Sequence, residues 1–244
     1  MSTRGLRDKM TAVSPPSQVS RLKLVGAGLY IAAWPALVLL LGGDWRWVEA
    51  WIFGVWFVGL SATAIVWLYR NDPALLAERF RKPGSGGQKG WDRWVVALMV
   101  ATFMAWIVVM PLDARRFGWS PSLPVWLKSV GAALLVPSAL LFVRAYTDNT
   151  FLSALVRIQT DRKHQVVSTG VYGFVRHPMY LGAVLMFVGV PLLLGSALGF
   201  GLTLVMIFLL AVRIVGEERM LADELEGYAE YRQRVRYRLI PLVW

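Results

Sequence analysis

A group of residues in the second half of the chain has the types and spacing of a ligand site at the start of a helix. Arg176, His177 and Pro178 follow a polar stretch and precede an apolar run. Proline suits the first helical position but pushes the preceding residue out of helical geometry, so His177 is expected to cap a helix. A helix N-terminus carries free N–H groups and partial positive charge. With Tyr180 in the first turn and Gly182 allowing another backbone or a ligand to come close, the pattern predicts a pocket for a carboxylate or phosphate. The plainer interpretation is that Arg176 reaches lipid headgroups and His177 only caps the helix.

A second group of ionisable residues follows the last apolar run. Arg213 and Glu217 are four residues apart, which places them on one face of a helix, and Glu218 follows directly. An ordinary surface ion pair would contribute little. Ionisable groups at the end of a membrane helix usually face a cavity, however, so we expect Arg213 and Glu217 to point into one.

The C-terminal residues have the periodicity of an amphipathic helix. Their apolar positions are three or four apart: Leu221, Leu225, Tyr228, Tyr231 and Val235. We expect one helix that lies along the membrane surface or folds back over the preceding helices. Its basic flank, Arg232 to Arg238, suits anionic lipid.

The segment between these groups and the earlier part of the chain is long and polar. Residues 147–178 form a connection of about 30 residues, and loops of that length are usually functional or disordered. Their aromatic and β-branched side chains argue against disorder. The chain has no cysteine, which excludes disulfides and thiolate chemistry, and the spacing of its two histidines, His164 and His177, does not suggest a metal site.

The elements that must position these residues are apolar and helical. Of the 244 residues, 57% are apolar and only 17% are charged. The apolar residues form six runs, each a credible membrane span or half of a hairpin: 24–42, 48–69, 94–112, 125–146, 179–194 and 197–212. The last two are short and are joined by Gly195-Ser196, so we expect a tight helical hairpin. The predicted fold is an all-α, polytopic transmembrane bundle with a C-terminal amphipathic helix.

The basic residues predict how the chain lies in a membrane. Of the 26 lysines and arginines, 22 fall in the segments on one side of these spans and four on the other. Positive charge favours the cytoplasmic side, so both termini and the connection are expected there, at the inner (plasma) membrane if the chain is bacterial. The basic residues punctuate apolar runs, which indicates membrane lipids as partners and not nucleic acid.

The order of these motifs resembles the isoprenylcysteine carboxyl methyltransferase family, whose wider group includes phospholipid N-methyltransferases. The resemblance covers about residues 145–241 and depends on four blocks: residues 164–172, 176–182, Glu217-Glu218 and 228–231. It implies an integral membrane enzyme that uses S-adenosylmethionine and methylates an amphipathic small molecule or a lipidated substrate. It also divides the chain into four N-terminal spans, 1–146, and a catalytic methyltransferase region, 147–244.

The family resemblance also implies roles for individual residues. The positions that would hold the cofactor are His164, Val166, Gly170, Tyr172, Arg176, His177, Tyr180 and Glu217. Arg213 and Glu218 would be catalytic, with the arginine orienting an acceptor carboxylate. No metal is implied.

The acceptor stays open on the sequence alone. Carboxyl O-methylation of the isoprenylcysteine type is the leading hypothesis, because a carboxylate is already anionic and needs only a cation to orient it. An amine acceptor, such as a phospholipid headgroup, must lose a proton, and Glu218 or His177 could assist. A nicotinamide-dependent membrane reductase is a further alternative, given partial likeness in the C-terminal helices.

Overall fold

The computed structural model describes residues 19–244, and within them it contains helices and connecting turns but no strand. The α-helices are α1 (Arg21–Gly42), α2 (Val48–Asn71), α3 (Pro73–Arg79), α4 (Gly90–Pro111), α5 (Val125–Asp148), α6 (Pro178–Leu194), α7 (Ala197–Glu224) and α8 (Tyr228–Arg234). A π-helical segment, η1 (Leu112–Phe117), extends α4, and two short 3₁₀ helices, η2 (Thr160–Arg162) and η3 (Gly170–Gly173), interrupt the connection. The all-helical prediction is confirmed.

Within residues 19–244, five helical segments are long and apolar enough to cross a membrane. They are α1, α2, α4 with its extension to Phe117, α5 and α7. The sixth predicted span corresponds to α6, which is apolar but has only 17 residues. At about 1.5 Å per residue, α6 is roughly 25 Å long, shorter than the hydrocarbon core. The chain is a multi-pass integral membrane protein, although a sixth full span is not confirmed.

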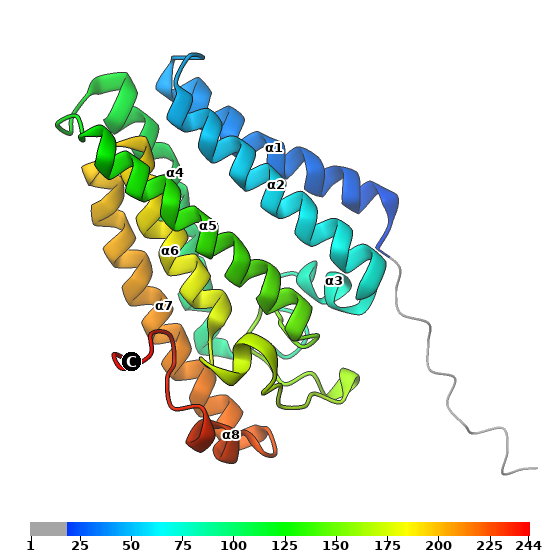
Figure 1. The fold of residues 1–244 in the computed structure, drawn as a ribbon. Helices are drawn as coiled ribbons and strands as arrows, with labels where there is room; N and C mark the ends of the chain where they lie inside the picture. Colours follow the sequence, from blue (N-terminus) through cyan, green and yellow to red (C-terminus); the bar gives the residue numbers. More distant parts are fainter. Residues whose placement is uncertain (1–18) are drawn as a thin grey trace, which may run out of the picture.

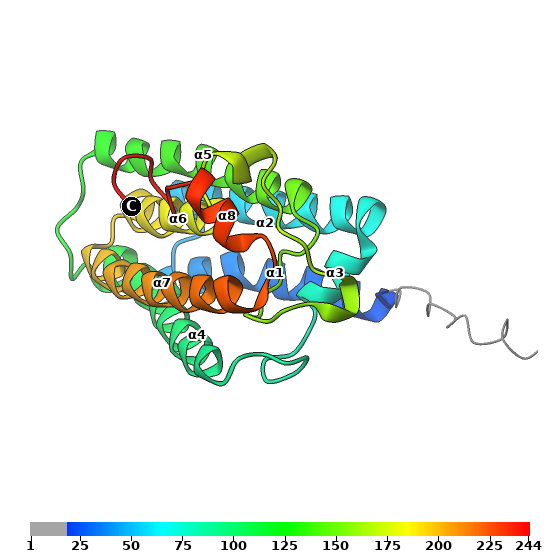
Figure 2. The ribbon, with the colours of Figure 1, turned by 90° about the horizontal axis from the view of Figure 1, so that it is seen from below.

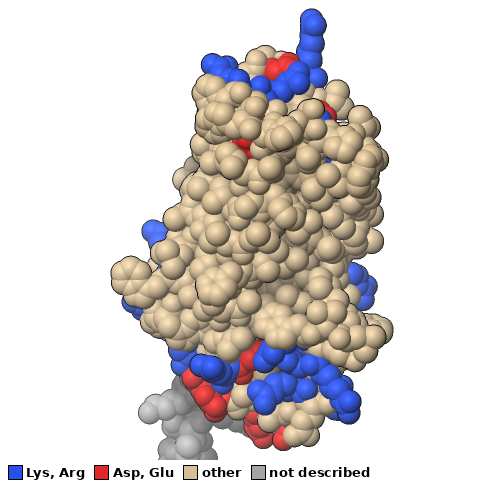
Figure 3. Space-filling model, turned by 90° about the vertical axis from the view of Figure 1, so that its left-hand side faces the viewer, with Lys and Arg blue, Asp and Glu red and all other residues tan. Residues whose placement is uncertain are grey.

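The long helices form one bundle whose two ends carry the charges (Figure 1). The α1–α2 turn, the α4–α5 loop and the α6–α7 turn lie at one end. Helices α3 and α8 and the connection lie at the other, and Figure 2 shows α8 in front of the helix ends there. On the face in Figure 3, charged side chains gather towards both ends and the broad middle is largely free of them. This distribution suits a helical bundle in a bilayer.

Small residues allow α5 and α6 to pack very closely. A side chain at Gly131 would collide with the backbone of α6 at Gly189 and Leu193. Ser138 donates a hydrogen bond to the Gly182 carbonyl at 2.7 Å, and a Cβ on Gly182 would lie 3.2 Å from the Ser138 carbonyl oxygen. Small residues are typical of membrane helix interfaces. Of the two roles expected for Gly182, the structure shows the close approach of another backbone, that of α5.

The predicted hairpin between α6 and α7 is present. Gly195 adopts a left-handed conformation with φ of 86°, and the Ser196 side chain caps α7 by accepting from the Gly199 N–H. At this turn the buried Asp113 carboxylate accepts hydrogen bonds from Ser196 Oγ and the Leu198 N–H. The second arm is much longer than its apolar run, because α7 continues for 28 residues to Glu224.

The predicted C-terminal amphipathic helix is present as α8, but the apolar stripe assigned to it begins in the preceding helix. Its apolar stripe is shared between α7 and α8, which are separated by a turn in which Gly227 adopts φ of 80°. Residues with side chains strongly disfavour this left-handed geometry, so the glycine permits the break. The stripe nevertheless packs as one cluster, in which Leu225, Tyr228, Tyr231 and Val235 are buried.

The basic residues follow the two ends of the bundle. Lys128 donates to Glu49 at 2.7 Å, and Arg115 pairs with Asp44, both at the end that has few basic residues. Arg4, Arg7 and Lys9 of the predicted cytoplasmic tail lie outside the described residues. Which end faces the cytoplasm stays a prediction.

Candidate active site

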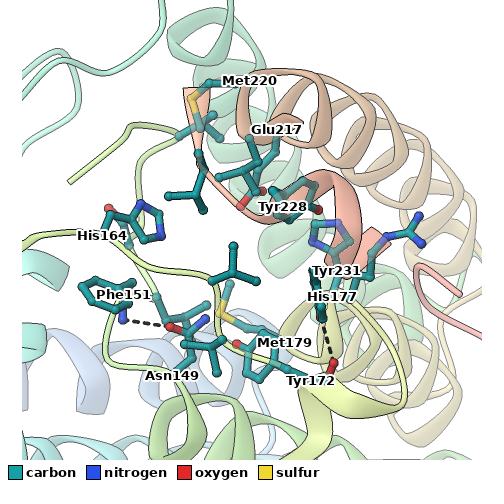
Figure 4. A pocket seen from close by; sticks show the side chains of 18 of the residues that line it. Asn149, Phe151, His164, Tyr172, His177, Met179, Glu217, Met220, Tyr228 and Tyr231 are labelled. Carbon is teal, nitrogen blue, oxygen red and sulfur yellow. Dashed lines mark hydrogen bonds between the residues drawn. The ribbon is translucent and has the colours of Figure 1, made fainter. Parts of the chain in front are cut away.

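One cavity lies at the end of the bundle where the connection, α6, α7 and α8 meet. It encloses about 780 Å³, counting its open side. The connection supplies one wall, the first turn of α6 the base, and α7 and α8 the opposite wall. Its polar and aromatic lining includes Asn149, Phe151, His164, Tyr172, Arg176, His177, Tyr180, Glu217, Tyr228 and Tyr231. Figure 4 shows most of these side chains around the opening.

The base of the cavity is the predicted helix start. Pro178 occupies the first turn of α6 and His177 is its N-cap residue, as expected. The preceding backbone is fixed by the C-terminal segment, because the N–H groups of Arg176 and His177 donate to the carbonyls of Tyr237 and Arg238. Both side chains line the cavity although they are buried.

Glu218 lies behind the bottom of the cavity and offsets the positive charge of the arginines there. Its carboxylate, only 2% exposed, accepts from Arg176 Nε at 2.6 Å and from Arg238 Nε at 2.8 Å, and it contacts His177 Nε2 at 3.2 Å. Glu218 is not among the cavity-lining residues. Its contacts hold the C-terminal segment against α6, and both of its oxygens are occupied.

Glu217 presents the acidic charge of the cavity. One carboxylate oxygen accepts from the Tyr180 hydroxyl at 2.7 Å, and the other has no hydrogen-bond partner within residues 19–244. Figure 4 shows the side chain directed towards the opening. The free oxygen is available to a cationic group of a ligand.

Arg213 lies one layer away from the cavity. It is 8% exposed, its Nε donates to Asp92 Oδ1 at 2.9 Å, and its Nη2 donates to the Ala154 carbonyl at 2.7 Å. The guanidinium carbon is 6.0 Å from the centre of the Tyr180 ring, and Tyr180 lines the cavity whereas Arg213 does not. Arg213 thus pairs with Asp92 of α4. Of the two residues expected to point into one cavity, Glu217 lines it and Arg213 does not.

The connection is anchored to α3 by a buried ion pair. Arg157 donates from Nε and Nη2 to the two oxygens of Glu78, at 2.9 Å each. Burial opposes ionisation of Glu78, but hydrogen bonds from Arg157 and Ser153 outweigh it and lower the pKa of this carboxyl to about 2. This pairing keeps the connection ordered at the cavity wall.

Two aromatic rings lie together in the wall that the connection forms. The rings of Phe151 and His164 are 4.9 Å apart, and the Phe151 N–H donates to Asn149 Oδ1 at 2.8 Å (Figure 4). Burial, together with the charges of Arg157 and Arg162, lowers the pKa of His164 to about 4. The imidazole is therefore neutral near pH 7 and can act as a hydrogen-bonding wall.

Three tyrosines line the cavity: Tyr228 and Tyr231 come from α8 and Tyr172 from η3 in the connection. The Tyr231 hydroxyl donates to the Tyr172 carbonyl at 2.8 Å, which joins α8 to η3 (Figure 4). Burial raises the pKa of Tyr231 to about 12 and also raises the pKa values of Tyr172 and Tyr228. All three phenols are neutral at physiological pH.

The cavity brings together most of the residues that the family resemblance assigned to the cofactor. His164, Val166, Tyr172, Arg176, His177, Tyr180 and Glu217 all line it, whereas Gly170 does not. Gly170 has φ of 58°, and a Cβ there would collide with the Asp148 carboxylate, which accepts from the Val171 N–H at 2.9 Å. Gly170 therefore forms a tight turn beside Asp148 and does not line the cavity.

Other cavity residues were not singled out from the sequence. Asn149, Phe151, Met179 and Met220 line the cavity with side chains from three separate segments. Only the length of the connection indicated that its first residues matter. Asp92, the partner of Arg213, was also missed, although a lone acid beside an apolar run is a signal. No group of three His, Asp or Glu side chains that could hold a metal ion is found between residues 19 and 244.

The fold and the cavity define a polytopic membrane protein with a polar ligand site at one end of its helices. This is the fold of the eukaryotic intramembrane Ras methyltransferase, isoprenylcysteine carboxyl methyltransferase. That structure matches with a TM-score of 0.52 and 20% sequence identity, over 91% of this chain and 84% of that one.

Sequence relatives agree with this comparison. Residues 126–226 match the phospholipid methyltransferase family. Protein-S-isoprenylcysteine O-methyltransferase B of Arabidopsis thaliana is 31% identical over 115 residues, 45% of this chain and 57% of the relative. Protein-S-isoprenylcysteine O-methyltransferase of Schizosaccharomyces pombe is 36% identical over 87 residues, 34% of this chain and 36% of the relative. The matches thus span about half or less of these relatives. They confirm the resemblance to the isoprenylcysteine carboxyl methyltransferase family.

Proposed function

We propose that this protein is an integral membrane methyltransferase that uses S-adenosylmethionine to methylate a carboxylate on an amphipathic, isoprenylcysteine-like acceptor. One observation carries the proposal. Seven positions that the family resemblance assigns to the cofactor, from three separate segments, line a single cavity at the end of the helices.

The residues of the cavity fit S-adenosylmethionine chemically. The ligand carries an ammonium and a sulfonium, which the free oxygen of Glu217 would attract, and a carboxylate, for which Arg176 has a guanidinium nitrogen, Nη2, without a hydrogen-bond partner within residues 19–244. The neutral His164 and Phe151 rings and the tyrosines of the lining would hold the flat adenine base. When bound, the cofactor supplies a methyl group activated by its sulfonium.

The protein's own contribution would be alignment and exclusion of water. The pair of Tyr180 and Glu217 fixes one wall, and the segment from α8 to the C-terminus covers the base of the cavity. Holding two reactants in line is a large catalytic contribution and requires no general base when the acceptor is a carboxylate. Arg213 does not line the cavity itself, but its Nη1 has no hydrogen-bond partner within residues 19–244 and its guanidinium lies by the Tyr180 ring, where it would orient an incoming carboxylate by charge-assisted hydrogen bonds. We infer that the apolar helices hold the lipid part of the acceptor, with the cavity and both termini on the cytoplasmic side.

The contacts of Glu218 favour a carboxylate acceptor over an amine. An amine must lose a proton, and Glu218 and His177 were the residues that could assist. In the structure they contact each other, and the Glu218 oxygens are occupied by Arg176 and Arg238. Glu218 does not line the cavity and both of its oxygens already accept hydrogen bonds, so this carboxylate is not placed to take a proton from an amine.

A methylation assay tests this proposal. Protein purified in detergent would be given labelled S-adenosylmethionine and either an S-prenylated cysteine with a free carboxylate or vesicles containing phosphatidylethanolamine. We expect a base-labile methyl ester on the prenylcysteine and no methylated lipid. Methylation of the amine alone would overturn the carboxylate assignment, and transfer to neither acceptor with no cofactor binding would overturn the proposed activity.

Two substitutions of Arg213, measured in the same assay, test its proposed role in turnover. Arg213→Lys keeps the charge but loses the planar fork, so it should bind cofactor and turn over slowly. Arg213→Ala should bind cofactor and be nearly inactive. Near-normal transfer by a folded Arg213→Ala protein would remove Arg213 from the catalytic machinery.

A further inference from the structure

Asp92 is a buried acid in the first turn of α4 that connects two parts of the site. It is 0% exposed. Its Oδ1 accepts from Arg213 Nε at 2.9 Å. Its Oδ2 accepts from the Val156 N–H at 3.1 Å and from Gln88 Nε2 at 2.7 Å. One oxygen of Asp92 thus binds α7. The other binds the connection at Val156, which lines the cavity.

The guanidinium of Arg213 is fixed on two of its three nitrogens. Asp92 holds Nε and the Ala154 carbonyl holds Nη2. Within the described part of the chain, Nη1 has no hydrogen-bond partner, and the guanidinium lies over the Tyr180 ring, whose hydroxyl holds Glu217. Within residues 19–244 the arrangement leaves one donor nitrogen, Nη1, without a partner, on a guanidinium that lies over a side chain of the cavity lining.

A buried arginine needs such a partner. An unpaired charge is very unfavourable away from water, and a long side chain loses substantial conformational freedom when it is fixed. The Asp92 carboxylate offsets the charge and selects one orientation of the fork. Planar donors in a fixed direction are what distinguishes arginine from lysine as a carboxylate-binding residue.

We infer that Asp92 is the positioning residue for Arg213. Through its Oδ2, which accepts from the Val156 N–H, Asp92 also connects Arg213 to the wall of the cavity that the connection forms. The inference rests on the proposed function, because it assigns Arg213 to the acceptor. Asp92 itself touches neither reactant. It acts through the arginine on the acceptor and through the connection on the cavity wall.

The asparagine variant separates the two contacts. Asp92 receives one donor, Arg213, on Oδ1 and two donors, Val156 and Gln88, on Oδ2. In Asp92→Asn the amide oxygen is expected to face the two donors, which turns the amide N–H₂ towards Arg213. The contact with the connection is then kept while that with Arg213 is lost. In Asp92→Ala both are lost.

Turnover and cofactor affinity are therefore measured on the same variants. In Asp92→Asn, we expect kcat to fall about tenfold or more, while affinity for S-adenosylhomocysteine changes by less than about threefold. In Asp92→Ala, we expect both quantities to fall. Asp113→Asn is the matched control, since Asp113 is equally buried at the opposite end of the bundle. It should lower thermal stability and leave the kcat of the folded protein unchanged.

A double-mutant cycle on thermal stability gives a readout that does not depend on activity. If Asp92 and Arg213 stabilise each other, Asp92→Asn should destabilise the wild-type protein more than it destabilises Arg213→Gln. Additive losses of stability, or a kcat within about twofold of wild type in folded Asp92→Asn, would overturn the inference. Failure of the proposed function would differ, because the wild-type protein would then neither bind cofactor nor transfer methyl.

Discussion

Replacement of Glu218 by glutamine should loosen the C-terminal segment from the helix bundle. Glutamine keeps the shape of the side chain but removes the charge that faces Arg176, Arg238 and His177 at 2.6, 2.8 and 3.2 Å. A hydrogen bond to a charged group contributes about 1.5–3 kcal/mol, roughly 1 kcal/mol more than a neutral one, so three contacts imply a loss of about 3 kcal/mol. This is at the lower end of the loss seen when a buried ion pair is broken, about 3–5 kcal/mol.

Thermal unfolding in detergent measures this loss. For a chain of this length, 3 kcal/mol corresponds to a decrease in Tm of about 6–12 °C. Glu49→Gln is the control, because its pair with Lys128 is partly exposed at the other end, where such pairs contribute about 0–1 kcal/mol. A Tm for Glu218→Gln within about 2 °C of that of Glu49→Gln would refute the view that Glu218 joins the C-terminal segment to α6.

Three further predictions concern other parts of the molecule. Gly170→Ala should lose about 1–3 kcal/mol of stability, because it combines a left-handed conformation with a collision at Asp148; unchanged thermal unfolding would show that the turn adapts. His164 has its pKa lowered from 6.5 to about 4 in the folded protein, so its contribution to stability is complete above about pH 6.5 and is lost as the pH falls towards 4. A pH series of Tm values should flatten in this range in His164→Asn, and an identical slope in both proteins would exclude burial of the neutral ring. Ser85→Cys, in a chain without cysteine, should react with an impermeant thiol reagent only from the cytoplasmic side, and labelling only from the outside would reverse the orientation.

The sequence was informative wherever chemistry is local. Apolar runs located the long helices, and Pro178 located the start of α6. The family resemblance identified seven residues that line the cavity because they fall in short blocks whose order is retained. The tight turn at Gly195-Ser196 could be predicted because glycine there permits the required backbone geometry.

Features that depend on distant pairing could not be predicted. Asp92 and Arg213 are 121 positions apart, and nothing in the periodicity of either helix pairs them. Because Glu217 is four residues from Arg213, the sequence suggested that these two residues lie together, whereas Arg213 pairs with Asp92 in the structure. The break between α7 and α8 was missed for a similar reason, since the apolar spacing continues across Gly227 and only the left-handed conformation of that residue reveals the turn.

Calorimetric binding of S-adenosylmethionine and of its demethylated product to the detergent-purified protein tests the central claim most directly. The account predicts saturable binding of both, with one site per chain. Glu217→Gln keeps an acceptor for the Tyr180 hydroxyl but removes the charge, so affinity should fall about tenfold or more. Arg46→Ala, at the opposite end of the bundle, should bind as the wild type does. No binding of either compound to folded wild-type protein, or equal affinity in Glu217→Gln and wild type, would contradict the assignment of the cavity; binding of a nicotinamide dinucleotide in their place would indicate a reductase.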